Sequence, residues 1–172
     1  MSELEDEWEI LIARAKDAAR HTGRSDVHDY LALRSSNDAI RRTAVKWLMN
    51  EVIAIASDPL RNGNAIDIER IDPHSFSAFK ANMVGTRIEV RRGVRCLAVE
   101  AGWTRTPSDG FMRGGALAFA RISHFGMPKK NMDIGLYRMG GTVDWAVIVE
   151  EKIASSFSSA DIERHLMIFH GR

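Results

Sequence analysis

Apolar residues recur at helical spacing through the first sixty residues of the chain. Leu4, Trp8, Leu11 and Ile12 share one face of a first helix, which we expect to start after a cap at Ser2. A short second helix is expected over 25–33. A third is expected from about residue 36 to the Asp58-Pro59 pair, because the residue before a proline is disfavoured in a helix.

The segment that follows carries mixed signals. A turn is expected at Asn62-Gly63, and the alternation over 66–69 is typical of a short edge strand. Asp72 and Pro73 then match the cap and first position of a helix. Phe76, Phe79 and Met83 would line one side of it, so the spacing predicts a helix over 73–84.

From residue 87 onward the period of the apolar pattern changes from about 3.6 to 2. Strands are expected over 87–91 and 94–103, joined in a hairpin at Arg92-Gly93, and over 115–125. A second hairpin, 133–139 with 142–151, would turn at Gly140-Gly141. Ser158 or Ser159 would cap a last helix.

These elements together predict a single α+β domain over residues 1–172. A mainly helical portion, 1–84, would pack on an antiparallel β-meander of about five strands. The meander and a closing helix would occupy 85–172.

Composition places the protein in a cellular compartment. The chain has one cysteine, Cys96, which excludes an intramolecular disulfide and a cysteine-based zinc cluster. Its first residues are acidic, unlike a signal peptide, and no apolar run reaches the ~18 residues that span a bilayer. We therefore expect a cytoplasmic protein without a membrane partner.

Charge is distributed unevenly along the chain. Residues 1–72 contain 10 Lys and Arg against 14 Asp and Glu, a balance of −4. Residues 80–130 contain 10 against 3, a balance of +7, and residues 131–172 carry −2. An anionic partner would therefore bind the central segment.

The central segment mixes cations with aromatic residues. Arginines contact phosphates and exposed aromatic rings stack on unpaired bases, so this mixture suits nucleic acid or another polyanion. The alternative is that the aromatic residues belong to the core and the arginines pair with the acidic helices. The candidate binding residues are Arg87, Arg91, Trp103, Arg105, Phe111, Arg113, Lys129 and Lys130.

The second predicted hairpin carries a different candidate site. Asp133 begins one strand, and Glu150 and Lys152 would lie near the end of its partner. Two carboxylates at one sheet edge suit Mg²⁺ or Mn²⁺, and a lysine beside them can stabilise charge on a phosphate. The alternative is that these charges occupy a solvated strand face.

Over about residues 115–170 this arrangement resembles the core of the PD-(D/E)xK nucleases. The resemblance implies metal-dependent phosphodiester cleavage, with Asp133 and Glu150 as metal ligands and Lys152 assisting. The chain departs from the family pattern at Glu151, where an apolar residue is usual, and in the absence of an acid from 73–84.

We therefore expect a binding module rather than an enzyme, needing no cofactor and binding nucleic acid or another polyanion. The first alternative is the metal-dependent nuclease. The second is a subunit for protein–protein assembly or self-association, using the amphipathic N-terminal helix with Trp8.

Overall fold

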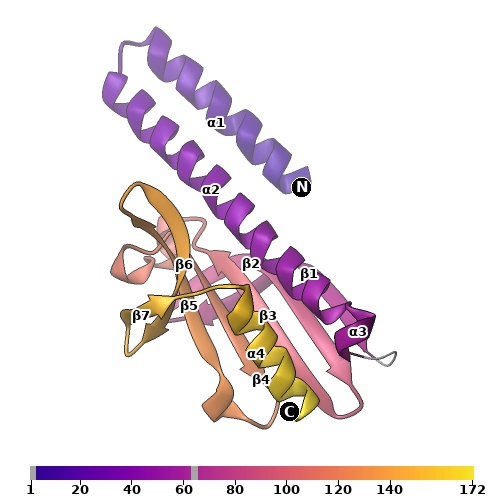
Figure 1. Cartoon of the computed structure of the whole chain (residues 1–172). Coiled ribbons are helices and arrows are strands. Elements are labelled where there is room, and N and C mark those ends of the chain that lie inside the picture. The colour runs from indigo at the N-terminus through magenta and orange to yellow at the C-terminus, as the bar shows by residue number, and fades with distance from the viewer. Residues whose placement is uncertain (1–2, 63–65) are drawn as a thin grey trace. The chain divides into compact units, whose positions relative to one another are not determined.

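The computed structural model describes residues 3–62 and 66–172, with the side chains of 3–5, 61 and 62 excepted. The expected cap at Ser2 and Gly63 of the expected turn lie outside the described residues. The elements in the described part are α1 (Glu3–His21), α2 (Ser25–Ala56), α3 (Pro59–Asn62), β1 (Asp67–Ala78), β2 (Ala81–Arg92), β3 (Arg95–Trp103), β4 (Ala118–His124), β5 (Met132–Met139), β6 (Thr142–Val149), β7 (Lys152–Ser156) and α4 (Ser159–His170) (Figure 1).

The chain divides into two compact units, Met1–Arg42 and Thr43–Arg172. In the first unit α1 and the beginning of α2 form an antiparallel hairpin. Arg42 on α2 forms an ion pair with Glu9 on α1 at 2.5 Å, and Ile12 and Ala19 are buried. The expectation of a single domain stays a prediction.

The second unit is built on one antiparallel sheet in which every strand pairs with the next along the chain. The sheet has seven strands rather than about five. The edge strand expected over 66–69 is longer and forms β1, and residues 152–156 form a further strand, β7, that was not expected. The α+β class and the meander are confirmed.

One face of the sheet, here called the covered face, is packed against helices. Residues 43–56 of α2 and the whole of α4 lie across it (Figure 1). Ile88, Val99 and Ile122 stand side by side there on β2, β3 and β4 and are buried. Residues buried on the helix side include Leu48 and Phe169. Apolar burial of this kind is the main stabilising contribution to folding.

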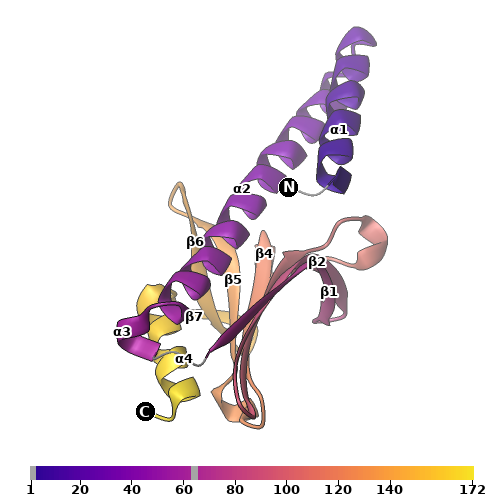
Figure 2. The same cartoon turned by 90° about the vertical axis from the view of Figure 1, so that its right-hand side faces the viewer.

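The opposite face, here called the open face, carries no α-helix within the described part of 43–172 (Figure 2). Alternation along the strands sends a row of charged side chains to it. Their register puts Arg87 beside Glu100, Glu100 beside Arg121, and Arg121 beside Asp133.

The predicted helix over 73–84 is wrong, because this segment forms the second half of β1, the turn and the start of β2. Phe76 and Met83 are seven apart, which places them on one helical face, but they are also direct cross-strand partners in the hairpin. Pro73 lies where the β1 register shifts, between Ile71 and His74, which is where an edge strand accepts proline.

The predicted second and third helices form one helix, α2. Ser36 and Asn37 looked like a helix start but lie in its interior. The ion pair between Arg41 and Asp38, at 2.7 Å and three residues apart, is of the kind that stabilises a continuous helix there. None of the described helices is both long enough and apolar enough to cross a membrane.

Candidate functional site: a basic end of the sheet

Asp133 lies on β5 directly opposite Arg121 on β4. The Arg121 guanidinium donates two hydrogen bonds to its carboxylate, Nε to Oδ1 at 2.7 Å and Nη2 to Oδ2 at 3.0 Å. This bidentate contact raises the pKa of Arg121 against the opposing effect of burial. The Asp133 carboxylate is thus the partner of a neighbouring arginine.

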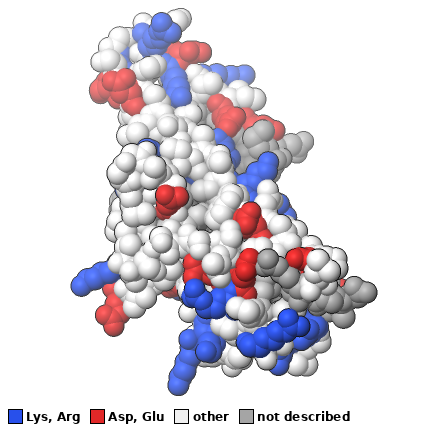
Figure 3. Space-filling model, viewed as in Figure 1, with Lys and Arg blue, Asp and Glu red and all other residues white. Residues whose placement is uncertain are grey.

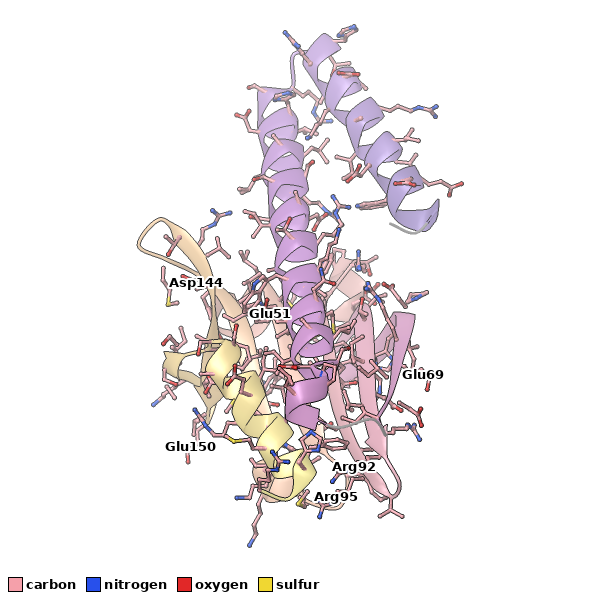
Figure 4. The ribbon with its side chains drawn as sticks, turned by 45° about the vertical axis from the view of Figure 1, so that its right-hand side comes forward. Glu51, Glu69, Arg92, Arg95, Asp144 and Glu150 are labelled. Carbon is pink, nitrogen blue, oxygen red and sulfur yellow. The ribbon has the colours of Figure 1, made fainter. Side chains whose placement is uncertain are left out.

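The sequence predicts Glu150 and Lys152 near the end of one strand. This prediction is wrong. β6 ends at Val149, Glu150 and Glu151 form the turn in left-handed conformations, and Lys152 begins β7 (Figure 4). Asp133 faces Ile148 across β5 and β6, so the turn lies beyond it along the strand. Within the described residues, no three His, Cys, Asp or Glu side chains are grouped to hold a metal ion. The nuclease hypothesis stays a prediction.

Three of the candidate arginines have carboxylate partners. Arg87 binds Glu89 at 2.8 Å and Glu100 at 3.2 Å, and Arg91 also pairs with Glu89. The hydrogen bond from Arg91 is the main cause that lowers the pKa of the largely buried Glu89, with Arg87 adding to it. Arg113 pairs with Glu151. Much of the basic central segment is therefore neutralised inside the fold.

The side chains of Trp103 and Arg105 stack on each other within the fold. Trp103 is 3% exposed, and the Arg105 guanidinium lies 3.9 Å from its ring centre while donating to the Val84 carbonyl. Phe111 is 82% exposed on the loop between β3 and β4. Trp103 therefore belongs to the core, as the alternative interpretation of the aromatic residues expected, whereas Phe111 does not.

Lys129 and Lys130 are exposed, in a short 3-10 turn between β4 and β5. This loop lies beside the β2–β3 turn, since the Phe125 amide donates to the Cys96 carbonyl at 2.9 Å. The two turns therefore lie side by side at the same end of the strands.

The last turn of α4 completes this region. Arg95 donates to the Phe169 carbonyl at 2.9 Å, and Arg92 donates to the His170 carbonyl at 3.5 Å (Figure 4). Cations are favourable at a helix C-terminus, where carbonyls lack partners within the helix. Neither arginine forms a salt bridge with a carboxylate of the described residues.

We call the region formed by residues 90–96, 123–132 and 168–172 the basic end. Its three segments contain six Lys and Arg residues and no Asp or Glu. Lys and Arg side chains gather at the corresponding lower part of Figure 3. The end of α4 lies against Arg95, since a Cβ added at Gly171 would lie 2.6 Å from Nη1 of Arg95. Burial, and then Arg92, Arg172 and Arg95, lower the pKa of His170. The six are Arg91, Arg92, Arg95, Lys129, Lys130 and Arg172.

Apolar side chains project among these cations. Val94 on the β2–β3 turn is 89% exposed, Phe125 at the end of β4 is 76% exposed, and Met127 is partly exposed. The sequence prediction of binding residues missed Arg92, Arg95 and Arg172 as well as these apolar residues. The available signal was apolar residues at turn positions, beside Gly93 and Gly126, in segments free of acid.

Trp8, the residue expected to mediate assembly, is 39% exposed, with the Arg34 guanidinium 5.0 Å from its ring centre. Self-association through α1 stays a prediction.

No protein-family model, curated protein or solved structure matches the chain.

Proposed function

We propose that this protein is a binding module for a phosphate-bearing polyanion and that the basic end is its binding surface. The observation that carries the proposal is the convergence of three segments that contain no Asp or Glu. They hold six cations, of which Arg91 is paired with Glu89, in a chain whose total charge is only +1. Concentrated positive charge of this kind attracts polyanions and increases their rate of association.

The cations of the basic end differ in how they support binding. Lys129 and Lys130 are exposed, so their ammonium groups can move to reach a phosphate. Arg92 and Arg95 are oriented by their bonds to the carbonyls of α4 and still have further guanidinium N–H groups to donate. This combination supports electrostatic binding without demanding one ligand shape.

Binding should weaken steeply with salt, because each neutralised phosphate releases a counterion. Inorganic polyphosphate carries neither bases nor lipid, so it tests the electrostatic part alone. With about five cations engaged, we expect log K to fall with log salt at a slope of about −4, measured by anisotropy of labelled polyphosphate. Affinity independent of ionic strength would contradict the proposal.

The double variant Lys129→Gln/Lys130→Gln should weaken polyphosphate binding about 30-fold at low salt, from ~1 kcal/mol for each lysine. It should also make the salt slope less steep. The matched control is Lys46→Gln/Lys152→Gln, which removes the same charge from exposed lysines on α2 and β7. Equal losses in both double variants would indicate a response to net charge and would reject the basic end as the site.

A further inference from the structure

The exposed apolar residues of the basic end are not needed to hold its two turns in place. Gly93 adopts the left-handed conformation that a tight hairpin turn requires, with φ of 59°. The β4–β5 loop is fastened by the His124 amide, which donates to the Asn131 side chain at 2.9 Å, and by the Phe125 amide. Val94, Phe125 and Met127 therefore remain available to contact something outside the fold.

The chemistry of these side chains distinguishes between two kinds of polyanion. Single-stranded nucleic acid is bound by stacking bases on aromatic rings, and of the three only Phe125 has a ring. Val94, the most exposed, and Met127 have no π-face. Apolar side chains flanked by Lys and Arg are the combination that enters the boundary between headgroups and acyl chains of a bilayer.

Charge complementarity points to the same partner. The cytoplasmic leaflet carries anionic lipids, which attract clusters of Lys and Arg at the surface. The three segments of the basic end contain no Asp or Glu that would repel these headgroups, and Glu89, beside the first of them, is paired with Arg91. Docking on a surface uses only side chains at turns, so it needs no spanning segment.

We propose that the basic end docks on the surface of an anionic lipid bilayer. Val94 and Phe125 enter the headgroup region, while Arg92, Arg95, Lys129 and Lys130 contact lipid phosphates and carboxylates. This inference rests on the proposed function, because the same cations bind both polyphosphate and lipid. It adds the class of partner and a role for the apolar residues.

The test is sedimentation with vesicles of phosphatidylcholine alone and with about 30% phosphatidylserine. The wild type should bind the anionic vesicles and not the neutral ones. Val94→Ser/Phe125→Ser should weaken vesicle binding at least about tenfold, because its apolar contact is lost. Its binding to polyphosphate should change less than about twofold, since its charges are unchanged. The matched control is Leu60→Ser on α3, at a leucine that is 97% exposed outside the basic end, and it should bind vesicles like the wild type.

The outcomes separate this inference from the proposed function. Polyphosphate binding without vesicle binding, or vesicle binding that is insensitive to Val94→Ser/Phe125→Ser, would overturn the lipid inference and leave polyanion binding standing. Tight binding to oligouridylate that depends on Phe125 and not on Val94 would assign the surface to nucleic acid instead. A wild-type protein that binds neither polyphosphate nor anionic vesicles would contradict both proposals.

A second measurement reports insertion directly and does not depend on comparing affinities. An environment-sensitive fluorophore is attached at Val94→Cys in a Cys96→Ser background. Its emission should shift to the blue with anionic vesicles and stay unchanged with polyphosphate. An unchanged spectrum on vesicle-bound protein would show that the turn stays in water, which would overturn the inference.

Discussion

Replacing Gly85 with alanine should destabilise residues 43–172 by more than about 3 kcal/mol, at or above the upper end of ordinary overpacking. Gly85 on β2 is paired with Gly102 on β3. A Cβ added at Gly85 would lie 1.8 Å from the Ala101 carbonyl oxygen and 2.6 Å from the Gly102 Cα. These are backbone atoms in a hydrogen-bonded ladder, so they cannot rotate away as a side chain would. Total stabilities of about 5–15 kcal/mol make such a loss large.

Urea denaturation followed by circular dichroism measures this loss. The control is Gly140→Asn at the β5–β6 turn, where an added Cβ would have no atom of the described residues within 4 Å apart from its own residue and chain neighbours, and asparagine tolerates the left-handed backbone. It should cost less than about 1 kcal/mol. A Gly85→Ala protein as stable as Gly140→Asn would show that the two strands can separate without cost.

Acidification from pH 6.5 to about 4 should remove about 3 kcal/mol of stability through one buried histidine pair. His124 on β4 and His165 on α4 are both buried, with Nε2 of the first 2.8 Å from Nδ1 of the second. Burial is the main cause that lowers the pKa of both, that of His165 to about 4 from 6.5. Lys130 further lowers the pKa of His124, and His124 and Arg164 further lower that of His165. The remaining nitrogens, His124 Nδ1 and His165 Nε2, have no hydrogen-bond partner among the described residues.

The lowered pKa of His165 determines that stability falls as the pH falls. Above pH 6.5 both rings are neutral in the folded and unfolded chains, so the contribution is fully present. As the pH falls toward 4 the unfolded chain takes up a proton that the folded His165 resists, and stability is lost. The charged groups around the pair are Lys130 and Arg164, which oppose protonation, and Asp161, which favours it.

Free energies of unfolding measured by urea between pH 7.5 and 4.5 test this prediction. The double variant His124→Leu/His165→Leu should lose most of the pH dependence in this range, whereas His21→Gln on α1 should keep it. A wild type that retains its full stability at pH 4.5 would show that the pair is protonated without cost. A steep slope remaining in the double variant would assign the effect to other groups.

β2 through β6 could be predicted after residue 85 because their local signals agree with the final structure, whereas β7 was not predicted. Alternation over β2 and β3, the turn at Arg92-Gly93, and the Gly140-Gly141 turn each predict a hairpin that the structure contains. A sheet of consecutive hairpins depends mainly on contacts near in sequence, which local patterns can indicate.

The β1–β2 hairpin could not be predicted in the same way. Phe76 and Met83 satisfy both a helical repeat and a cross-strand pair, and Asp72-Pro73 satisfies both a helix start and an edge-strand irregularity. The local sequence therefore fits a helix and a hairpin equally well. Pairing of β2 with β3 along nine residue pairs resolves them, because it orders β2 as a strand on which β1 then adds.

The residues of the candidate site could also not be identified from local sequence alone. Uneven charge predicted that an anion would bind within 80–130, but the arginines in that range are not equivalent. Arg87 and Arg91 are neutralised by Glu89 and Glu100, while Arg92 and Arg95 cap α4 and face outward with Lys129 and Lys130. Arg172, at the other end of the chain from the first helices, joins them only through α4.

The sequence by itself determined the α+β class, the antiparallel meander and the location of excess positive charge, because these depend on local periodicity and on composition. The tertiary structure alone decided which of those charges are paired and which are available. Ion pairing depends on the register of neighbouring strands, and a shift of one residue would exchange the charged face for the buried one. The basic end exists because register neutralises the arginines on the open face while the turns and the end of α4 bring the remaining cations together.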